Sequence, residues 1–212
     1  MKVGVIDYGV GNLGSVVRAL EVLRVTPLLV DRPTDMHAAD RLILPGVGNF
    51  ADCFGMLEVG QWITALKEEV LGYDRPLLGV CLGMQLLADS STEGSVGGES
   101  VLGLGFVPGK VQHLGVLGCQ LRVPHVGWNA VTSAQAQDHL FHEIPPETDF
   151  YFVHSYAFVA QDASDVIATA HYGSTITAAV RRGHVWGTQF HPEKSSKAGF
   201  KVLKNFIEGP LC

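Results

Sequence analysis

The sequence has no long apolar run, no cluster of basic residues and no closely spaced pair of cysteines. Because a membrane-spanning helix needs about 20 apolar residues, no such helix is predicted. The N-terminal stretch Met1–Asp7 predicts a strand running into an acidic residue, not a signal peptide. A net charge of −6 without a basic patch argues against binding to nucleic acid or anionic membranes. We therefore expect a soluble, cytoplasmic protein.

The four cysteines, Cys53, Cys81, Cys119 and Cys212, are scattered along the chain. None of them forms a C-x-x-C pair or joins a histidine cluster with metal-ligand spacing, so neither a disulfide framework nor a structural zinc site is predicted. No metal and no organic cofactor is implied. Cys53, Cys119 and Cys212 are interpreted as inert thiols.

The chain is rich in hydrophobic residues, which make up 47% of it, and it contains 25 glycines among 212 residues. This length suits one well-filled domain over residues 1–212, with no linker and no internal repeat. Short apolar runs alternate with helical patterns in the first half, whereas the second half has apolar runs separated by turns. We predict an α/β fold with a mixed, largely parallel central sheet flanked by helices, and a smaller antiparallel portion in the C-terminal half.

The patterns also place individual elements. Strands are predicted over 2–7, 28–30, 41–44, 77–80, 106–113, 121–131, 150–153, 166–170, 176–180 and 185–190, and helices over 16–23, 51–57, 62–71, 82–88, 138–141 and 197–208. Pro124 and Gly127 predict an edge or bulged strand over 121–131. The stretch 90–105, rich in Gly, Ser and Glu, predicts a surface excursion.

Cys81 falls on the turn between the apolar run Leu77–Val80 and the helical pattern that starts at Leu82. Gly79 and Gly83 flank it at two residues on either side, which is the spacing of a nucleophile elbow with Cys in place of Ser. A helix N-terminus beneath a thiol favours the thiolate. The alternative is a small buried residue in a tight connection, but the paired glycines favour a nucleophile.

A general base for this nucleophile is predicted at His191. It follows the apolar run Trp186–Phe190, and Pro192 prevents the strand from continuing. Glu193 can fold back to hold one ring nitrogen of His191 while the other nitrogen faces Cys81. Cysteine, histidine and carboxylate together match the logic of a catalytic triad.

Two glycine-containing loops have a functional and a plain interpretation. In the loop 45–50, Gly46 and Gly48 surround Val47 and free backbone N–H groups to stabilise an oxyanion, although an ordinary turn is as consistent with the pattern. Near the N-terminus, Gly9, Gly11 and Gly14 spell G-x-G-x-x-G after a strand, and Asp31 follows at nearly the right distance for a dinucleotide-binding site.

The segments Gly79–Gln85 and Phe190–Glu193 resemble the motifs of the class I, or triad, glutamine amidotransferases. Further segments, 6–13, 44–48, 124–129, 151–156 and 189–196, are similar to the glutaminase subunits of imidazole glycerol phosphate synthase within that family. The resemblance covers essentially the whole chain and outweighs the dinucleotide interpretation. It implies a flavodoxin-like fold, hydrolysis of glutamine to glutamate and ammonia, and delivery of the ammonia to a TIM-barrel cyclase subunit in histidine biosynthesis.

The resemblance also implies roles for single residues. Cys81, His191 and Glu193 would be catalytic, and the oxyanion donors would be the Leu82 N–H and an N–H of Val47 or Gly48. Glutamine binding would involve Gln85, Glu93, Ser155 and Tyr156, and the contact with the cyclase would involve Asn12, Arg18, Trp128 and Lys194. We further predict that the Val47 peptide reorients when the partner binds.

Three alternatives remain open on the sequence. A paralogous glutaminase would supply ammonia to a sugar-modifying enzyme of surface-polysaccharide synthesis. A catalytically silent activator has no chemical reason to keep Cys81, His191 and Glu193. A stand-alone cysteine hydrolase is disfavoured by Gln85 and by the His191-Pro192-Glu193 spacing. Trp128 is predicted either as an exposed anchor or as a core residue, and Asn12 and Lys194 either as interface or as solvated surface.

Overall fold

The computed structural model describes residues 1–95, 97, 99–133 and 138–209, so Cys212 lies outside the described residues. The strands are β1 (Lys2–Ile6), β2 (Thr26–Val30), β3 (Arg41–Gly46), β4 (Leu77–Cys81), β5 (Ser90–Ser91), β6 (Val101–Leu102), β7 (Gly109–His113), β8 (His125–Ser133), β9 (Thr148–His154), β10 (Tyr156–Ala160), β11 (Val166–His171), β12 (Thr175–Arg182) and β13 (Val185–Thr188). The α-helices are α1 (Leu13–Val22), α2 (Phe50–Val59), α3 (Trp62–Lys67), α4 (Leu82–Gln85) and α5 (Ser196–Glu208).

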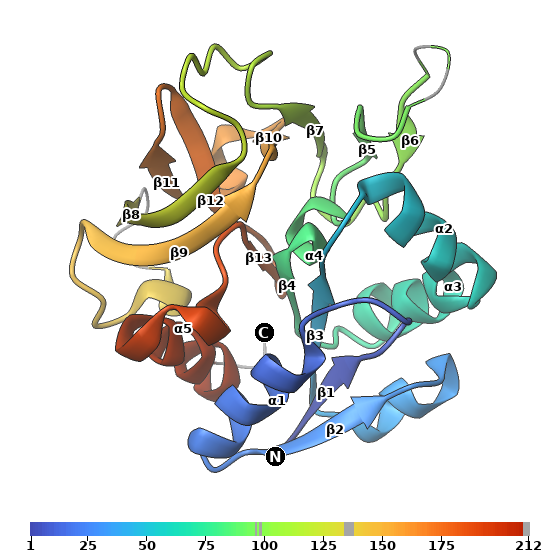
Figure 1. Cartoon of the computed structure of the whole chain (residues 1–212). Helices are drawn as coiled ribbons and strands as arrows, with labels where there is room; N and C mark the ends of the chain where they lie inside the picture. Colours follow the sequence, from blue (N-terminus) through green and yellow to red (C-terminus); the bar gives the residue numbers. More distant parts are fainter. Residues whose placement is uncertain (96, 98, 134–137, 210–212) are drawn as a thin grey trace.

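Nine strands form one sheet in the order β2-β1-β3-β4-β13-β12-β11-β8-β9 (Figure 1). The neighbours from β2 to β13 run parallel, and those from β13 to β9 run antiparallel. The predicted mixed sheet with a smaller antiparallel portion in the C-terminal half is therefore confirmed. A second sheet, β10-β7-β5-β6, was not predicted.

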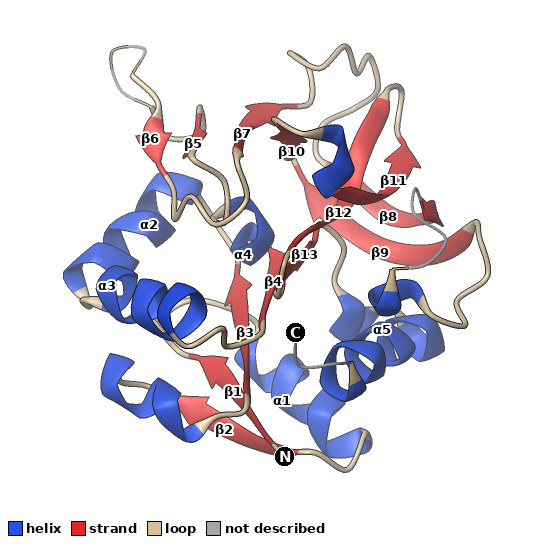
Figure 2. Ribbon diagram, turned by 180° about the vertical axis from the view of Figure 1, so that it is seen from behind, coloured by secondary structure: helices blue, strands red, loops and turns tan. Residues whose placement is uncertain are grey.

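Helices cover both faces of the parallel half. Helices α1 and α5 lie on one face, and α2 and α3 lie on the other, as the front and back views both show (Figures 1 and 2). Alternate residues of a strand point to opposite faces, so Ile43 joins the core under α1 and α5, while Leu42 and Leu44 join the core under α2 and α3. Burial on both faces explains the continuous apolar runs of β3 and β4 in the sequence.

Several predicted element boundaries are wrong. The strand predicted over 121–131 begins only at His125, because Pro124 has no N–H to donate to a ladder. It is not an edge strand, since β8 lies between β11 and β9. However, β11 pairs only with its last residues, Val131–Ser133, which leaves the first half with β9 alone.

Two other segments are shorter or more ordered than predicted. The α-helix after Cys81 ends at Gln85 and continues as turns, and the predicted excursion 90–105 contributes β5 and β6 to the second sheet. Within the described residues, no helix is long and apolar enough to cross a membrane.

Candidate active site

Cys81 occupies the sharp turn from β4 into α4, as predicted. Its backbone has φ 56° and ψ −111°, in a region that side chains rarely adopt. The flanking glycines allow the turn, because a Cβ on Gly79 would lie 2.5 Å from the Gly83 carbonyl oxygen. A Cβ on Gly83 would lie 1.9 Å from the Leu44 carbonyl oxygen of β3. Any larger residue at either position would push the elbow away from the sheet.

His191 and Glu193 lie just after β13, the strand that pairs in parallel with β4. The Nδ1 of His191 lies 2.8 Å from Oε1 of Glu193, and both side chains are almost fully buried. The backbone of His191 is fixed to β9, because its N–H donates to the Tyr151 carbonyl at 2.9 Å and its carbonyl accepts from the Ser195 hydroxyl at 2.6 Å. Because Nδ1 contacts Glu193, Nε2 is the ring nitrogen that has no hydrogen-bond partner among the described residues.

The surroundings of His191 favour its charged form. Burial by itself lowers the pKa of His191, but its contacts with Cys81 and with Glu193 outweigh burial and raise the pKa to about 9. The Nε2 of His191 and Oε2 of Glu193 are buried and lack a hydrogen-bond partner among the described residues. The unpaired Nε2 is therefore available to exchange a proton with Cys81 and with a reacting molecule.

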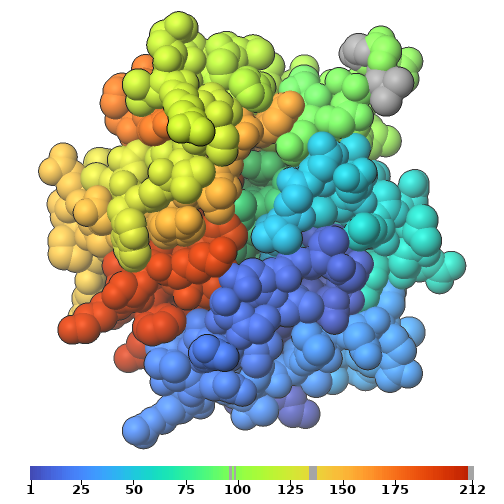
Figure 3. Space-filling view, viewed as in Figure 1, coloured from blue at the N-terminus to red at the C-terminus, as the bar shows by residue number. Residues whose placement is uncertain are grey.

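A pocket of about 440 Å³ contains Cys81 and His191. It opens on the face shown in Figure 3, between the yellow and orange antiparallel part of the chain and the cyan helix α2. Its lining brings together the predicted residues Val47, Gly48, Cys81, Leu82, Gln85, Glu93, Ser155, Tyr156 and His191, and adds Pro124, Val153 and His154. Residues more than 140 positions apart in the sequence thus meet at one pocket.

The predicted oxyanion donors lie on two sides of the nucleophile. Among the described residues, the backbone N–H groups of Val47, Gly48 and Leu82 donate to no backbone carbonyl. Leu82 N–H is the first of α4, where the helix has no internal acceptor for it. The Val47 carbonyl is held from the other side, since it accepts from the Cys53 thiol at 3.3 Å. These N–H groups are therefore available to donate to an oxyanion.

Gln85 is buried at the back of the pocket, and both of its N–H groups are used within the protein. Its Nε2 donates to the Tyr156 carbonyl and to Oε1 of Gln189, each at 2.9 Å. Gln189 in turn places its Nε2 3.9 Å from the Cys81 sulfur. Only the Oε1 of Gln85 is left for a ligand, because its Nε2 holds the pocket wall together.

Glu93 is not simply solvated. Its Oε2 accepts from the Phe50 N–H at 3.0 Å, at the start of α2, where Asn49 also caps the helix. Burial raises the pKa of Glu93, and the hydrogen bond from Phe50 partly opposes that shift. A carboxylate at the mouth of the pocket, fixed by a helix N-terminus, suits an ammonium group on a ligand.

The residues predicted to contact a partner do not line this pocket. Trp128 is 54% exposed and its ring lies 6.1 Å from that of Tyr151, so the core alternative for Trp128 is wrong. Lys194 is exposed and lies 6.0 Å from the Tyr151 ring. Arg18 is exposed on α1. Asn12 is half-buried, and its Nδ2 lies 3.4 Å from Oε1 of Glu193.

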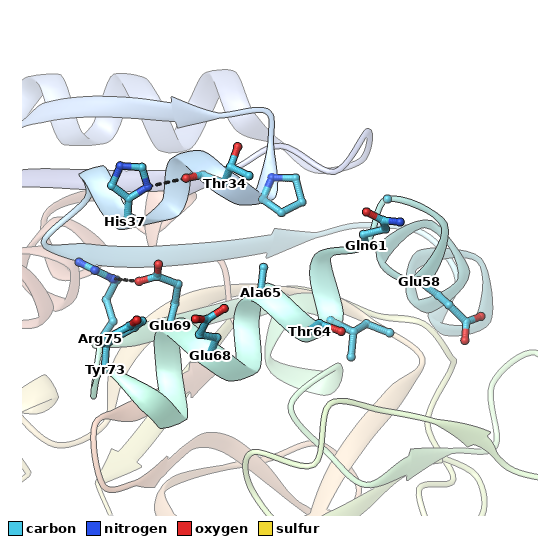
Figure 4. Close-up of a pocket in the computed structure, with 13 residues that line it drawn as sticks. Thr34, His37, Glu58, Gln61, Thr64, Ala65, Glu68, Glu69, Tyr73 and Arg75 are labelled. Carbon is cyan, nitrogen blue, oxygen red and sulfur yellow. Dashed lines mark hydrogen bonds and ion pairs between the residues drawn. The ribbon is translucent and has the colours of Figure 1, made fainter.

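A larger hollow of about 1020 Å³ lies between α3 and the 3-10 helix Pro33–Ala38 (Figure 4). Its lining residues include no cysteine, and its acidic Glu69 is paired with Arg75 at 2.6 Å. The described residues contain no group of three or more His, Cys, Asp or Glu side chains that could hold a metal ion. Reactive groups therefore gather in the smaller pocket.

Sequence reasoning missed two buried polar residues of the site, Gln189 and His154. Both lie inside segments that carry the family resemblance, next to residues that were singled out. A polar side chain in an apolar strand was the available signal, because such a group must find a partner when buried.

A cysteine at a strand-to-helix elbow, beside a buried His–Glu pair, has the arrangement of the triad hydrolases. The comparisons narrow this class. The family model "Glutamine amidotransferase class-I" matches residues 4–209. "Imidazole glycerol phosphate synthase subunit HisH" of Moorella thermoacetica is 45% identical over 206 residues, covering 97% of this chain and 94% of the relative. "Imidazole glycerol phosphate synthase subunit HisH 1" of Prochlorococcus marinus is 45% identical over 211 residues, covering 98% and 97%.

The chain therefore belongs to the class-I glutamine amidotransferases and, within them, to the HisH family. Solved structures agree on the fold. A "glutamine amidotransferase" has a TM-score of 0.74 at 20% identity, with 97% of each chain covered. PurLQS from Thermotoga maritima has the same TM-score at 17% identity, again with 97% of each chain covered.

Proposed function

We propose that residues 1–212 form a single amidotransferase domain that works in the cytoplasm as the glutaminase subunit of imidazole glycerol phosphate synthase. It hydrolyses glutamine to glutamate and ammonia and passes the ammonia to a cyclase subunit, which makes imidazole glycerol phosphate and an aminoimidazole carboxamide ribonucleotide. The observation that carries the proposal is that Cys81 and His191 line one pocket, with the buried Glu193 against His191, in a chain of the HisH family.

The first half of the reaction forms a thioester. Cys81 gives its proton to Nε2 of His191, and the thiolate attacks the carboxamide carbon of glutamine. The carbonyl π electrons move onto oxygen, which becomes an oxyanion. When the oxyanion collapses, the C–N bond breaks, and His191 returns the proton to the departing nitrogen, which leaves as ammonia. Glu193 fixes the ring and stabilises its charged form throughout.

The second half hydrolyses the thioester. His191 takes a proton from a water molecule, and the hydroxide attacks the thioester carbon. A second oxyanion collapses with cleavage of the C–S bond, and the proton on His191 returns to the Cys81 sulfur. The products are glutamate and the free thiol, so no external oxidant or cofactor is needed to balance the reaction.

Both oxyanions need N–H donors that are free before the reaction. Leu82 N–H and an N–H from Val47 or Gly48 suit this role, since none of them donates to a backbone carbonyl of the described chain. Removing one oxyanion donor typically raises the barrier by about 2.7 to 4 kcal/mol. We therefore propose that reorientation of the Val47 peptide on partner binding would set the level of activity.

Trp128 and Lys194 are exposed, which suits a contact with the cyclase. In the proposal this partner has a TIM-barrel fold, and Asn12 and Arg18 complete the contact. Val126 and Val153 are exposed on the same face of β8 and β9, opposite one another in the ladder. An exposed apolar group with an aromatic residue is typical of an interface. A closed contact here would keep ammonia from being protonated in bulk water.

The test is glutamate production from glutamine by the protein alone and with the cyclase plus its nucleotide ligand, with Cys81→Ala as the control. We expect activity that rises strongly with the cyclase and vanishes in Cys81→Ala. Cysteine-dependent activity that ignores the cyclase would instead indicate another ammonia acceptor, such as a sugar-modifying enzyme. Absence of activity in every combination would indicate a silent activator.

A further inference from the structure

Two buried histidines, one lining the pocket and the other beside it in the ladder, are not used by the proposed mechanism. His125 is the first residue of β8, and His154 is the last residue of β9, directly opposite it in the antiparallel ladder. Their side chains are 3% and 5% exposed. Nδ1 of His125 lies 2.9 Å from Nε2 of His154, and Nδ1 of His154 lies 2.8 Å from the Tyr156 carbonyl oxygen.

The partners fix where each proton is. The Tyr156 carbonyl can only accept, so Nδ1 of His154 carries the hydrogen and its Nε2 accepts. That Nε2 therefore receives the Nδ1 hydrogen of His125, whose own Nε2 accepts from Asn129 Nδ2 at 3.3 Å. The second hydrogen of Asn129 goes to the His171 carbonyl at 3.0 Å. All of these hydrogen bonds can form together only when both histidine rings are neutral, because each ring then has one N–H donor and one nitrogen acceptor.

The surroundings favour this neutral pair. Burial lowers the pKa of His125 to about 4. Burial lowers the pKa of His154 to about 3, helped by the nearby His125 and His191 and opposed by the hydrogen bond to the Tyr156 carbonyl. The His125 ring is stacked between those of Phe152 and Tyr172, at 4.8 and 4.0 Å. The phenol of Tyr172 donates to the Arg122 carbonyl and brings no charge to the pair.

The chain of hydrogen bonds ends at the substrate pocket. The Tyr156 carbonyl accepts from His154 on one side and from Gln85 Nε2 on the other, at 2.8 and 2.9 Å. His154, Ser155 and Tyr156 all line the pocket that holds Cys81. Because one carbonyl is shared by His154 and Gln85, the position of the corner at Ser155 depends on the histidine pair.

We infer that His154 and His125 are positioning residues for glutamine: as a hydrogen-bonded pair they fix the Tyr156 carbonyl against Gln85 and so shape the pocket wall that faces Cys81. The inference rests on the proposed glutaminase function. A hydrophobic side chain would fill the same space but would leave the Tyr156 carbonyl with one donor fewer in a buried place, where a lost hydrogen bond is costly.

The experiment compares two reagents that reach Cys81 by different routes. A diazoketone analogue of glutamine needs the substrate pocket, whereas iodoacetamide needs only an accessible thiolate. Labelling of Cys81 is followed by peptide mass spectrometry, next to kcat and KM for glutamine in the complex with the cyclase. The variants are His154→Leu, which loses the donor, and His154→Asn, whose amide can replace Nδ1. His142→Leu, at an exposed histidine, is the matched control.

In His154→Leu we expect kcat/KM to fall about tenfold, mainly through KM, with an equal loss of diazoketone labelling. Iodoacetamide labelling should stay within about twofold, and His154→Asn should recover most of the loss. Unchanged kcat/KM in His154→Leu would overturn the inference. So would equal slowing of both reagents without recovery in His154→Asn, because that pattern describes lost packing.

If His154→Leu does not fold, His125→Leu replaces it, since His125 does not line the pocket. A rise in KM without a change in iodoacetamide labelling supports the inference, and an unchanged KM overturns it. Failure of the proposed function looks different. There the unmodified protein would be labelled by iodoacetamide at Cys81, yet would neither turn over glutamine nor react with the diazoketone.

Discussion

In the parallel half of the nine-stranded sheet, β3, β4 and β13 are buried along their whole length, whereas β8 and β9 in the antiparallel half alternate between buried and exposed residues. In the proposed mechanism the parallel half supplies the reacting groups, because Cys81 ends β4 and His191 follows the neighbouring strand β13. The antiparallel half supplies the pocket wall at His154 and the outward face at Trp128. Reaction chemistry and recognition are thus divided between two kinds of strand, and the pocket lies where they meet.

The contribution of the parallel half is removed most completely by Cys81→Ala. Loss of a catalytic nucleophile costs up to about 10⁶-fold in kcat in a comparable triad, so we expect glutamate release to fall by at least about 10³-fold. Continuous measurement of glutamate in the presence of the cyclase checks this. Activity within tenfold of the unmodified protein would mean that another residue forms the covalent bond.

A subtler change in the same half is Glu193→Gln, which keeps the shape but removes the charge beside His191. We expect kcat to fall by about 10²-fold or more. Because Glu193 helps to raise the pKa of His191, its loss should lower that pKa. The imidazolium then deprotonates at a lower pH than about 9.

The pH dependence of Cys81 alkylation and of kcat measures this shift. The basic limb of the profile should move toward lower pH in Glu193→Gln, while Glu143→Gln, at an exposed glutamate, should leave it in place. If the basic limb does not move in Glu193→Gln, Glu193 does not affect the pKa of His191.

The contribution of the antiparallel half is tested by Trp128→Ala. Truncating a central aromatic anchor costs about 2 kcal/mol or more, or about 30-fold in Kd. We expect this loss in binding to the cyclase, measured by titration calorimetry, with the basal glutaminase activity retained. The control is Val59→Ala, at an exposed valine on α2, which should leave the Kd for the cyclase within about twofold. Equal effects of the two variants would place the contact elsewhere.

The close approach of the elbow to β3 is tested by the smallest change, Gly83→Ala. The added methyl group meets the Leu44 carbonyl oxygen, so we expect a loss of about 1 to 3 kcal/mol in unfolding free energy. Gly55→Ala is the matched control in α2, where a Cβ meets nothing within 4 Å and Ala is favoured by up to about 1 kcal/mol. Denaturant titration of both variants should give shifts of opposite sign.

The same division explains how much the sequence predicted. In the parallel half, nearly all of the information is local: an apolar run, paired glycines and a proline placed Cys81 and His191 correctly. In the antiparallel half, the residue at which a strand begins or ends depends on which neighbouring strand it pairs with. The sequence pattern alone did not show that the ladder starts at His125, or that residues between Ser90 and Gly105 pair in a second sheet.

The buried polar contacts were least predictable. Gln85 and Gln189 are 104 positions apart, and their hydrogen bond follows from how α4 packs against β13. The family resemblance implied that Gln85 binds substrate, and the sequence did not predict that its amide donates to the Tyr156 carbonyl. His154 was missed for the same reason, since its partner His125 is reached only through the β8–β9 ladder.

In the proposed mechanism, Cys81 becomes covalently attached to the carbonyl carbon of glutamine. Acid quenching of the complex during turnover, followed by peptide mass spectrometry, measures this directly. We expect a γ-glutamyl group on the peptide that contains Cys81, formed with glutamine and lost when glutamine is exhausted. Steady turnover in which this group appears on another residue, or on none, would contradict it.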